Sequence, residues 1–89
     1  MTSDTEEVLT PALIRAARGL LGLDQAQVAE RAGLKQRTIS KLEREIEFSL
    51  KDKRRREALA AIRHAFENDG IEFIFPSETS GPGVRMKLL

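Results

Sequence analysis

The stretch that decides the fold runs from Gln25 to Arg44, QAQVAERAGLKQRTISKLER. Apolar residues recur at helical spacing on both sides of Gly33, which indicates two short helices joined by a tight turn. Glycine suits such a turn because it adopts a left-handed backbone conformation without a steric penalty. The remaining chain is therefore expected to pack around this pair of helices or to support it.

The spacing of small and apolar residues in this unit meets the packing requirements of a helix-turn-helix. Counting from Gln25, the motif needs a small fifth residue, a glycine at the ninth position, a branched apolar residue at the fifteenth and an apolar residue at the eighteenth. These positions hold Ala29, Gly33, Ile39 and Leu42. A small Ala29 allows the following helix to cross closely, so a larger side chain there should spread the two helices.

Two further helices are predicted, one on each side of the unit. The first begins at Pro11, with Thr10 as its N-cap, and ends at Gly22. Its inward stripe includes Ile14, Ala17 and Leu21, while Arg15 and Arg18 fall on the opposite side and are expected to be solvated. The other runs from about Leu50 to Asp69, with Ser49 as its cap, and Ile46, Phe48 and Leu50 are expected to fold over the core before it.

After Gly70 the apolar pattern changes from helical to alternating, which predicts two short strands around the loop PSETSGPG. An isolated hairpin is marginal in water, so it must pack on the last helix or pair with the same element of a second chain. The residues expected at a dimer interface are Ile71, Phe73, Phe75, Val84, Met86 and Leu88. The predicted fold is mainly α: four helices with a C-terminal two-stranded β-hairpin. Its parts are a flexible arm (1–9), a helix-turn-helix domain (10–70) and the hairpin (71–89).

Composition limits the alternatives. The chain has 89 residues, of which 33% are charged and 40% hydrophobic, and it contains no cysteine. It is therefore expected to be one small domain without disulfides or thiolate metal sites. No apolar run is long enough for a membrane span and the start of the chain is acidic, so we expect a cytoplasmic protein. No catalytic constellation, metal site or cofactor is predicted, and the single histidine, His64, is expected to lie on the surface.

Charge is segregated although the formal net charge is only +1. The outward face of the second helix of the unit is predicted to carry DNA contacts, namely Lys35, Gln36, Arg37, Thr38, Ser40, Lys41 and Arg44. Glu43 is the one acid expected on this face. Arg37 or Lys35 can donate to guanine, and Gln36 can pair with adenine. The run KDKRRR that begins at Lys51 supplies candidate phosphate contacts, Lys53, Arg54 and Arg55. Both sets could instead be solvated helix faces, and the basic run could face an acidic partner.

The sequence resembles the phage Cro and repressor-like (XRE) family of helix-turn-helix regulators. The resemblance rests on LTPALIRAARGLLGL followed by DQAQVAERAGLKQRTISKLER, and the ending GIEFIF...GPGVRMKLL is similar to that of a short bacterial subgroup. It implies that the second helix of the unit lies in the major groove with Lys35, Gln36, Arg37 and Lys41 toward the bases. It also implies that Gln25, at the start of the first helix, contacts the phosphate backbone.

Lys35 departs from the family pattern because it stands where a capping Ser, Thr or Asn is usual. Loss of such a cap typically costs about 1 kcal/mol, and a lysine adds a positive charge at the positive end of the helix. A phosphate or guanine partner explains this lysine better than stability does. Glu45 likewise stands where a glycine often ends the helix, which leaves the path of the following EIEFSL open.

The expected function is sequence-specific binding of double-stranded DNA by a homodimeric transcriptional regulator on a palindromic operator. With no ligand-binding or enzymatic domain expected, control by the protein's own concentration is the simplest mode, as in a small repressor or autoregulating controller. The alternative is a protein-interaction module on a helix-turn-helix scaffold, such as an antitoxin, with a toxin or transcription factor as its protein partner. An enzyme is not expected.

Overall fold

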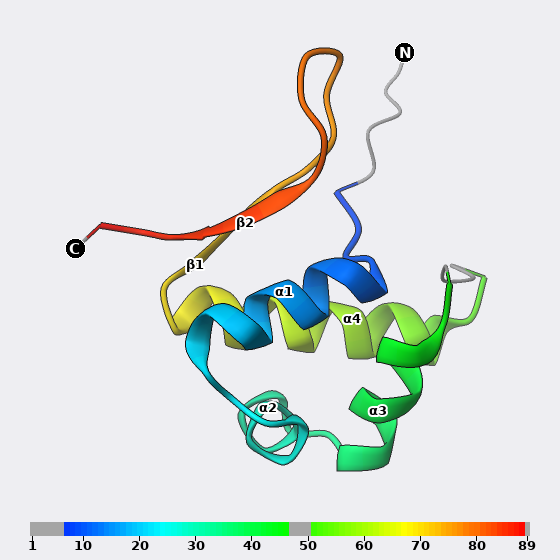
Figure 1. Ribbon diagram of the computed structural model, residues 1–89. Coiled ribbons are helices and arrows are strands. Elements are labelled where there is room, and N and C mark those ends of the chain that lie inside the picture. Colours follow the sequence, from blue (N-terminus) through cyan, green and yellow to red (C-terminus); the bar gives the residue numbers. More distant parts are fainter. Residues whose placement is uncertain (1–6, 47–50, 89) are drawn as a thin grey trace.

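The computed structural model of this protein describes residues 7–46 and 51–88. In order, these residues form α1 (Pro11–Leu21), α2 (Gln25–Ala32), α3 (Gln36–Arg44), α4 (Lys53–Asn68), β1 (Ile71–Ile74) and β2 (Gly83–Met86). Figure 1 shows α2 and α3 on one side of α1 and α4, with the hairpin on the other. The described part is thus mainly helical with a two-stranded C-terminal hairpin, which confirms the predicted fold class.

Local capping fixes the ends of α1 and α2. Thr10 Oγ1 accepts a hydrogen bond from the Leu13 amide at 3.2 Å, and Pro11 occupies the first turn of α1. Asp24 and Gln27 form the reciprocal capping box at the start of α2, with bonds of 2.8 and 2.9 Å. Gly33 has a φ of 70°, so the turn between α2 and α3 uses the left-handed conformation that glycine permits. These ends lie where the sequence predicted them.

The core joins all four helices to the hairpin. The largest fully buried side chains are Ile14 of α1, Val28 of α2, Ile39 of α3, Ile62 and Phe66 of α4, and Ile71 of β1. Each helix therefore buries one apolar stripe, and the stripe of α3 fixes which of its residues face outward. An ion pair of 2.8 Å from Arg31 to Asp69 additionally joins the ends of α2 and α4.

The start of α4 differs from the prediction. The helix begins at Lys53 and its N-cap is Asp52, whose carboxylate accepts a hydrogen bond from the Arg54 amide at 2.9 Å. A carboxylate is a strong N-cap, and its negative charge interacts favourably with the positive end of the helix dipole. Both effects explain why Asp52 takes this position. Ile46 was expected over the core but is 96% exposed. The predictions for Phe48, Ser49 and Leu50 lie outside the described residues.

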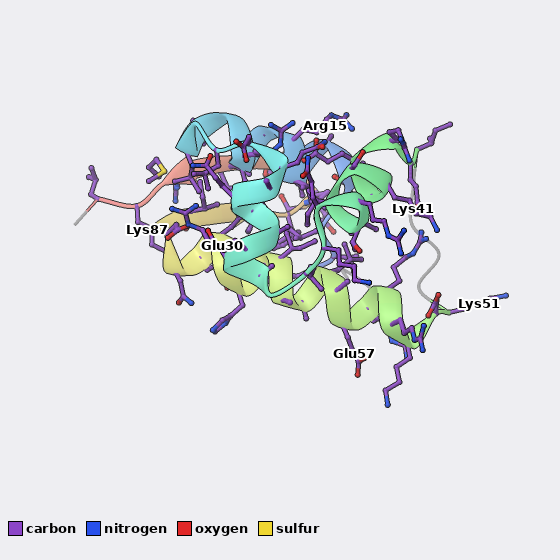
Figure 2. The ribbon with its side chains drawn as sticks, turned by 90° about the horizontal axis from the view of Figure 1, so that it is seen from below. Arg15, Glu30, Lys41, Lys51, Glu57 and Lys87 are labelled. Atoms are coloured by element: carbon purple, nitrogen blue, oxygen red, sulfur yellow. The ribbon has the colours of Figure 1, made fainter. Side chains whose placement is uncertain are left out.

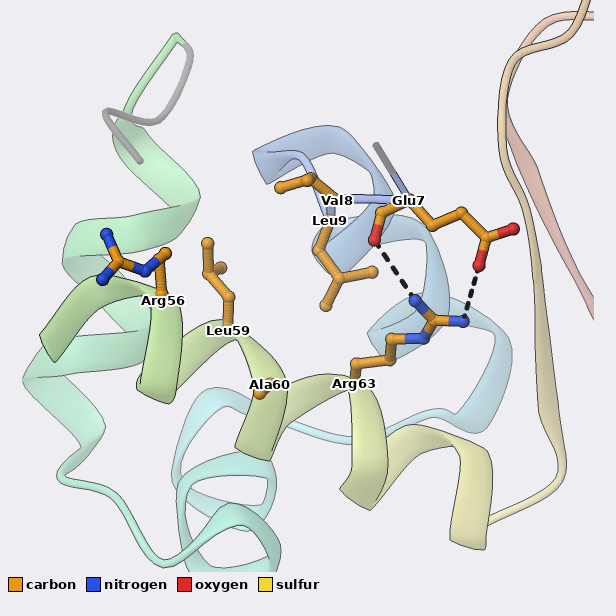
Figure 3. A pocket seen from close by; sticks show the side chains of 7 residues that line it. All are labelled: Glu7, Val8, Leu9, Arg56, Leu59, Ala60 and Arg63. Atoms are coloured by element: carbon orange, nitrogen blue, oxygen red, sulfur yellow. Dashed lines mark hydrogen bonds and ion pairs between the residues drawn. The ribbon is translucent and has the colours of Figure 1, made fainter. Parts of the chain in front are cut away.

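Residues 7–9 belong to the folded domain and not to an arm. Leu9 is buried in the core and Val8 packs against it. Figure 3 shows how Arg63 of α4 holds this segment: its guanidinium donates to the Glu7 carbonyl at 3.2 Å and lies 3.4 Å from the Glu7 carboxylate. An open, mostly apolar pocket of about 500 Å³ separates the segment from α4. The same guanidinium lies 4.8 Å from the centre of the Phe75 ring, so Arg63 also ties the hairpin to α4.

The hairpin is antiparallel, and its register pairs Ile71 with Met86 and Phe73 with Val84. The predicted apolar face therefore forms, but its inner part is used within one chain. Ile71 and Phe73 are buried in the core, and the Phe73 ring packs edge-on against Phe66 with centroids 6.0 Å apart. They cannot also form a dimer surface, because the core of their own chain covers them. Of the six residues predicted at the interface, Phe75 and Val84 are half-buried, while Met86 and Leu88 are exposed.

Candidate nucleic-acid interface

Helix α3 has one apolar side and one polar side. Ile39 and Leu42 are buried against the other helices. The side chains predicted to contact DNA lie on the rest of the helix: Lys35, Gln36, Arg37, Lys41 and Arg44 are exposed, and Thr38 and Ser40 are half-buried. The exposed part of α3 therefore offers amide and guanidinium groups, which can make paired hydrogen bonds to base edges.

Lys35 occupies the N-cap position of α3, as the sequence predicted. Its backbone is extended, with φ −84° and ψ 147°, and its side chain makes no capping hydrogen bond. The first amides of α3 therefore lack the side-chain acceptor that α1 and α2 have. An anion near this helix end would be favoured both by those amides and by the Lys35 ammonium group.

A cleft of about 610 Å³ lies between α3 and the start of α4. Its lining includes one acid, Asp52, and five basic residues, Arg37, Lys41, Arg44, Arg54 and Arg55. The basic residues of α3 and those at the start of α4, which are separated in the sequence, thus line one surface. Figure 2 shows Lys41 and Lys51 at the same end of the molecule. Lys53 is exposed on the first turn of α4 but does not line the cleft.

Arg55 differs from its neighbours in the basic run because it is half-buried. Its guanidinium forms an ion pair and a hydrogen bond with the carboxylate of Glu45, the residue that follows α3. This contact joins the end of α3 to the first turns of α4. Arg55 therefore positions the cleft, while Arg54 is exposed at its rim and Arg37 and Lys41 are exposed on its α3 side.

Glu43 was expected on the outward face of α3, but its side chain is only 4% exposed. The Arg18 guanidinium donates to its two carboxylate oxygens, from Nε at 2.8 Å and from Nη2 at 2.9 Å. Hydrogen bonding to Glu43 raises the pKa of Arg18 above its usual value, despite an opposing effect of burial. Arg18 is therefore not a solvated surface residue as predicted. A signal was present in the sequence, because Glu43 follows Ile39 by four residues and so lies on the same side of the helix.

The network around Glu43 reaches both neighbouring helices. Gln25 Nε2 at the start of α2 donates to the Glu43 carboxylate at 3.2 Å, and Arg15 Nη1 of α1 donates to the Glu43 carbonyl at 2.6 Å. One residue of α3 thus holds α1 and α2 together. Gln25 keeps a second amide hydrogen, and its side chain is half-buried at the position predicted to contact phosphate.

The described surface shows little other chemistry. His64 is exposed, and no group of three or more metal-ligating side chains occurs within residues 7–46 and 51–88. No helix in this part of the chain is both long and apolar enough to cross a membrane.

Comparison with protein families agrees with this geometry. Residues 14–52 match the helix-turn-helix family model. The match spans most of α1, all of α2 and α3, and Asp52 before α4. No curated protein matches the chain.

Proposed function

We infer that this chain, a DNA-binding regulator whose residues 14–52 form a Cro/repressor-like (XRE) helix-turn-helix, acts as a homodimer on a palindromic operator. The observation that carries this proposal is the polar face of α3. The side chains proposed to read bases, Gln36 and Arg37, are exposed on this face, and the face adjoins the basic cleft at the start of α4. The apolar face of the same helix is fully committed to the core.

Base readout is assigned to the first turns of α3. The Gln36 amide can donate to and accept from one adenine edge, and the Arg37 guanidinium can donate twice to a guanine. Each such bidentate contact discriminates against the wrong base by about 1 to 3 kcal/mol. Lys35 and Lys41 flank these residues along the helix, and Thr38, Ser40 and Arg44 complete the predicted contact set on α3.

Phosphate contacts are assigned to two groups of residues, one on each side of α3. Arg54 and Lys53 are exposed on the first turn of α4, beside the basic cleft. Gln25 lies at the opposite side of α3, where the Glu43 carboxylate fixes its amide. With α3 in a groove, the DNA backbone on one side would meet Arg54 and Lys53, and the backbone on the other side would meet Gln25. These contacts would fix the orientation of α3 in the groove.

A second copy of the chain is proposed to pair at the exposed end of the hairpin. Met86 is 44% exposed and Leu88 is 99% exposed, and Leu20 of α1 is also an exposed large apolar residue. A two-stranded sheet leaves both outer edges unpaired, so the same edge of another copy can extend it. In a symmetric dimer the two α3 helices should face half-sites about 34 Å apart, roughly one turn of DNA. A bound dimer over a promoter would exclude polymerase, which makes repression the simplest outcome.

The decisive experiment is binding to selected DNA. Sites are selected from a random duplex library, and affinity for the best site is measured by gel shift with wild-type protein, Gln36→Ala and Arg37→Ala. Each variant should lose about tenfold to a hundredfold in affinity for that site and relax the preference at one position. Glu57→Ala, on the exposed side of α4, provides the control and should bind as wild type. Unchanged affinity in both α3 variants would refute base readout by this helix.

The dimer is tested separately by sedimentation. Leu88 is exposed, so Leu88→Asp should leave the fold of the single chain intact. If the hairpin edge pairs two copies, the added charge should separate them and give folded monomers. Phe73 is unsuitable for this purpose because it belongs to the core. A dimer that persists in Leu88→Asp would place the interface elsewhere. A wild-type protein that is monomeric with and without DNA would refute the homodimer itself.

A further inference from the structure

Arg15 lies on the side of α1 that the sequence predicted to be simply solvated, but the structure holds its head group against α3. Its Nη1 donates to the carbonyl of Glu43 at 2.6 Å, in the last turn of the helix. The residue is nevertheless exposed. Figure 2, which views the molecule from the side of α2 and α3, shows Arg15 beside the end of α3.

The two arginines of α1 differ in how their charge is used. The Arg18 guanidinium is neutralised by the Glu43 carboxylate, and its Nη1 also donates to the Leu23 carbonyl at 3.3 Å. Arg15 binds a neutral carbonyl, and it takes part in no ion pair within the described residues. Its positive charge is therefore still available to an anion, and its guanidinium has further N–H donors beyond the one used.

The neighbourhood of Arg15 is already part of the proposed interface. Gln25, the predicted phosphate contact of α2, bonds the same Glu43 residue whose carbonyl holds Arg15. Side chains from α1 and α2 therefore meet the same residue of α3, Arg15 at its backbone carbonyl and Gln25 at its carboxylate. A phosphate that met the Gln25 amide would lie next to a fixed, uncompensated guanidinium.

We propose that Arg15 is an additional phosphate-contacting residue, which forms one DNA-backbone site together with Gln25 on the α1 side of the recognition helix. The inference rests on the DNA-binding function proposed above. The hydrogen bond to Glu43 orders the long side chain before DNA arrives, so less conformational entropy is lost on binding. Arg15 contacts no base, so it strengthens binding without selecting sequence.

Salt dependence measures this contact directly. The logarithm of the binding constant falls linearly with the logarithm of the salt concentration. Each phosphate that the protein neutralises makes this negative slope steeper by about 0.9. The proposed homodimer carries two copies of Arg15, so Arg15→Gln should make that slope shallower by roughly twice this amount, and it should weaken specific and unrelated duplexes alike. Arg15→Lys keeps the charge and should keep the slope. Arg85→Gln removes another exposed charge, on β2, which is not among the residues assigned to DNA contact, and should leave the slope unchanged.

A purely structural role for Arg15, as a cap for the carbonyl end of α3, gives a different result. In that case Arg15→Gln would lower Tm while the salt slope of the folded protein stayed at the wild-type value, which would overturn the proposal. Arginine modification by phenylglyoxal, mapped by mass spectrometry, tests the wild-type protein itself. Arg15 should react in free protein and be protected by duplex DNA, whereas Arg85 should react in both.

The two levels of the proposal fail in distinguishable ways. If wild-type protein binds DNA with a strong salt dependence but Arg15 is neither protected nor needed for the slope, the Arg15 assignment is wrong and the function stands. If wild-type protein binds no duplex DNA at all in the library selection, both the function and the Arg15 site are wrong.

Discussion

Arg18→Met is expected to destabilise the protein strongly, because it leaves the Glu43 carboxylate buried without its cation. The Glu43 side chain is 4% exposed and loses both bonds from Arg18, which leaves only the 3.2 Å bond from Gln25. Removing one partner of a fully buried ion pair costs about 3 to 5 kcal/mol. The Arg18 side chain is 27% exposed, so water can reach part of the vacated space and the cost should fall at or somewhat below the lower limit of that range.

A loss of about 2 to 3 kcal/mol should lower Tm by roughly 10 to 20 °C in a domain of this size. The assay is thermal and urea unfolding followed by circular dichroism. Arg85→Met is the matched control, because Arg85 also pairs with a glutamate, Glu72, at 2.9 Å but at an exposed position. Exposed pairs contribute little, so Tm of this control should be close to that of the wild type.

The double variant Arg18→Met with Glu43→Leu sharpens the test. Replacing both members of a buried pair by apolar residues removes the uncompensated charge, so most of the lost stability should return. The reasoning would be refuted if Arg18→Met lowered Tm no more than Arg85→Met, or if the double variant were less stable than Arg18→Met alone. The first result would mean that Glu43 is hydrated in solution, and the second that a leucine side chain in place of Glu43 cannot pack between the helices.

Three further outcomes are expected. Gly33→Ala should lower the free energy of unfolding by about 1 to 2 kcal/mol because its φ is 70°, whereas Gly19→Ala within α1, also with no atom near an added Cβ, should raise it by about 0.5 to 1 kcal/mol. Lys35→Ser should stabilise α3 by about 1 kcal/mol in urea unfolding yet weaken DNA binding. The hydrogen bond from Arg85 lowers the pKa of Glu72, so its stabilising contribution is present above the unfolded pKa and fades as pH falls through the folded one. NMR titration should show that pKa rising in Arg85→Gln.

Local sequence signals determined the helix-turn-helix and its caps. Thr10, Asp24 and Gln27 act through hydrogen bonds to residues three positions away, so their roles could be predicted without tertiary structure. The same holds for Gly33 and for the apolar stripe of α3, since both depend on backbone conformation and helical period alone. These features correctly placed most of the polar side chains of α3 at the surface, namely Lys35, Gln36, Arg37, Lys41 and Arg44.

Contacts between distant residues could not be obtained in this way. The bond from Arg18 to Glu43 spans 25 positions and the contact of Arg63 with Glu7 spans 56, and neither has a sequence period to reveal it. The spacing of four from Ile39 indicates the buried side of α3 for Glu43, but it does not identify Arg18 as the partner of that carboxylate. For the same reason residues 7–9 were placed in an arm. The hairpin gave a similar result: alternation showed which residues share a face, but not that the core of the same chain covers Ile71 and Phe73.

The sequence by itself thus determined that this chain builds a helix-turn-helix with α3 as its second helix, because helical period and capping are local. Only the tertiary structure decided how that helix is held, since the crossing of α1, α2 and α3 is what brings Arg15, Arg18 and Gln25 to Glu43. It also decided that the basic start of α4 shares a cleft with α3. Burial depends on what the rest of the chain covers, and the hydrophobic pattern of one segment does not contain that information.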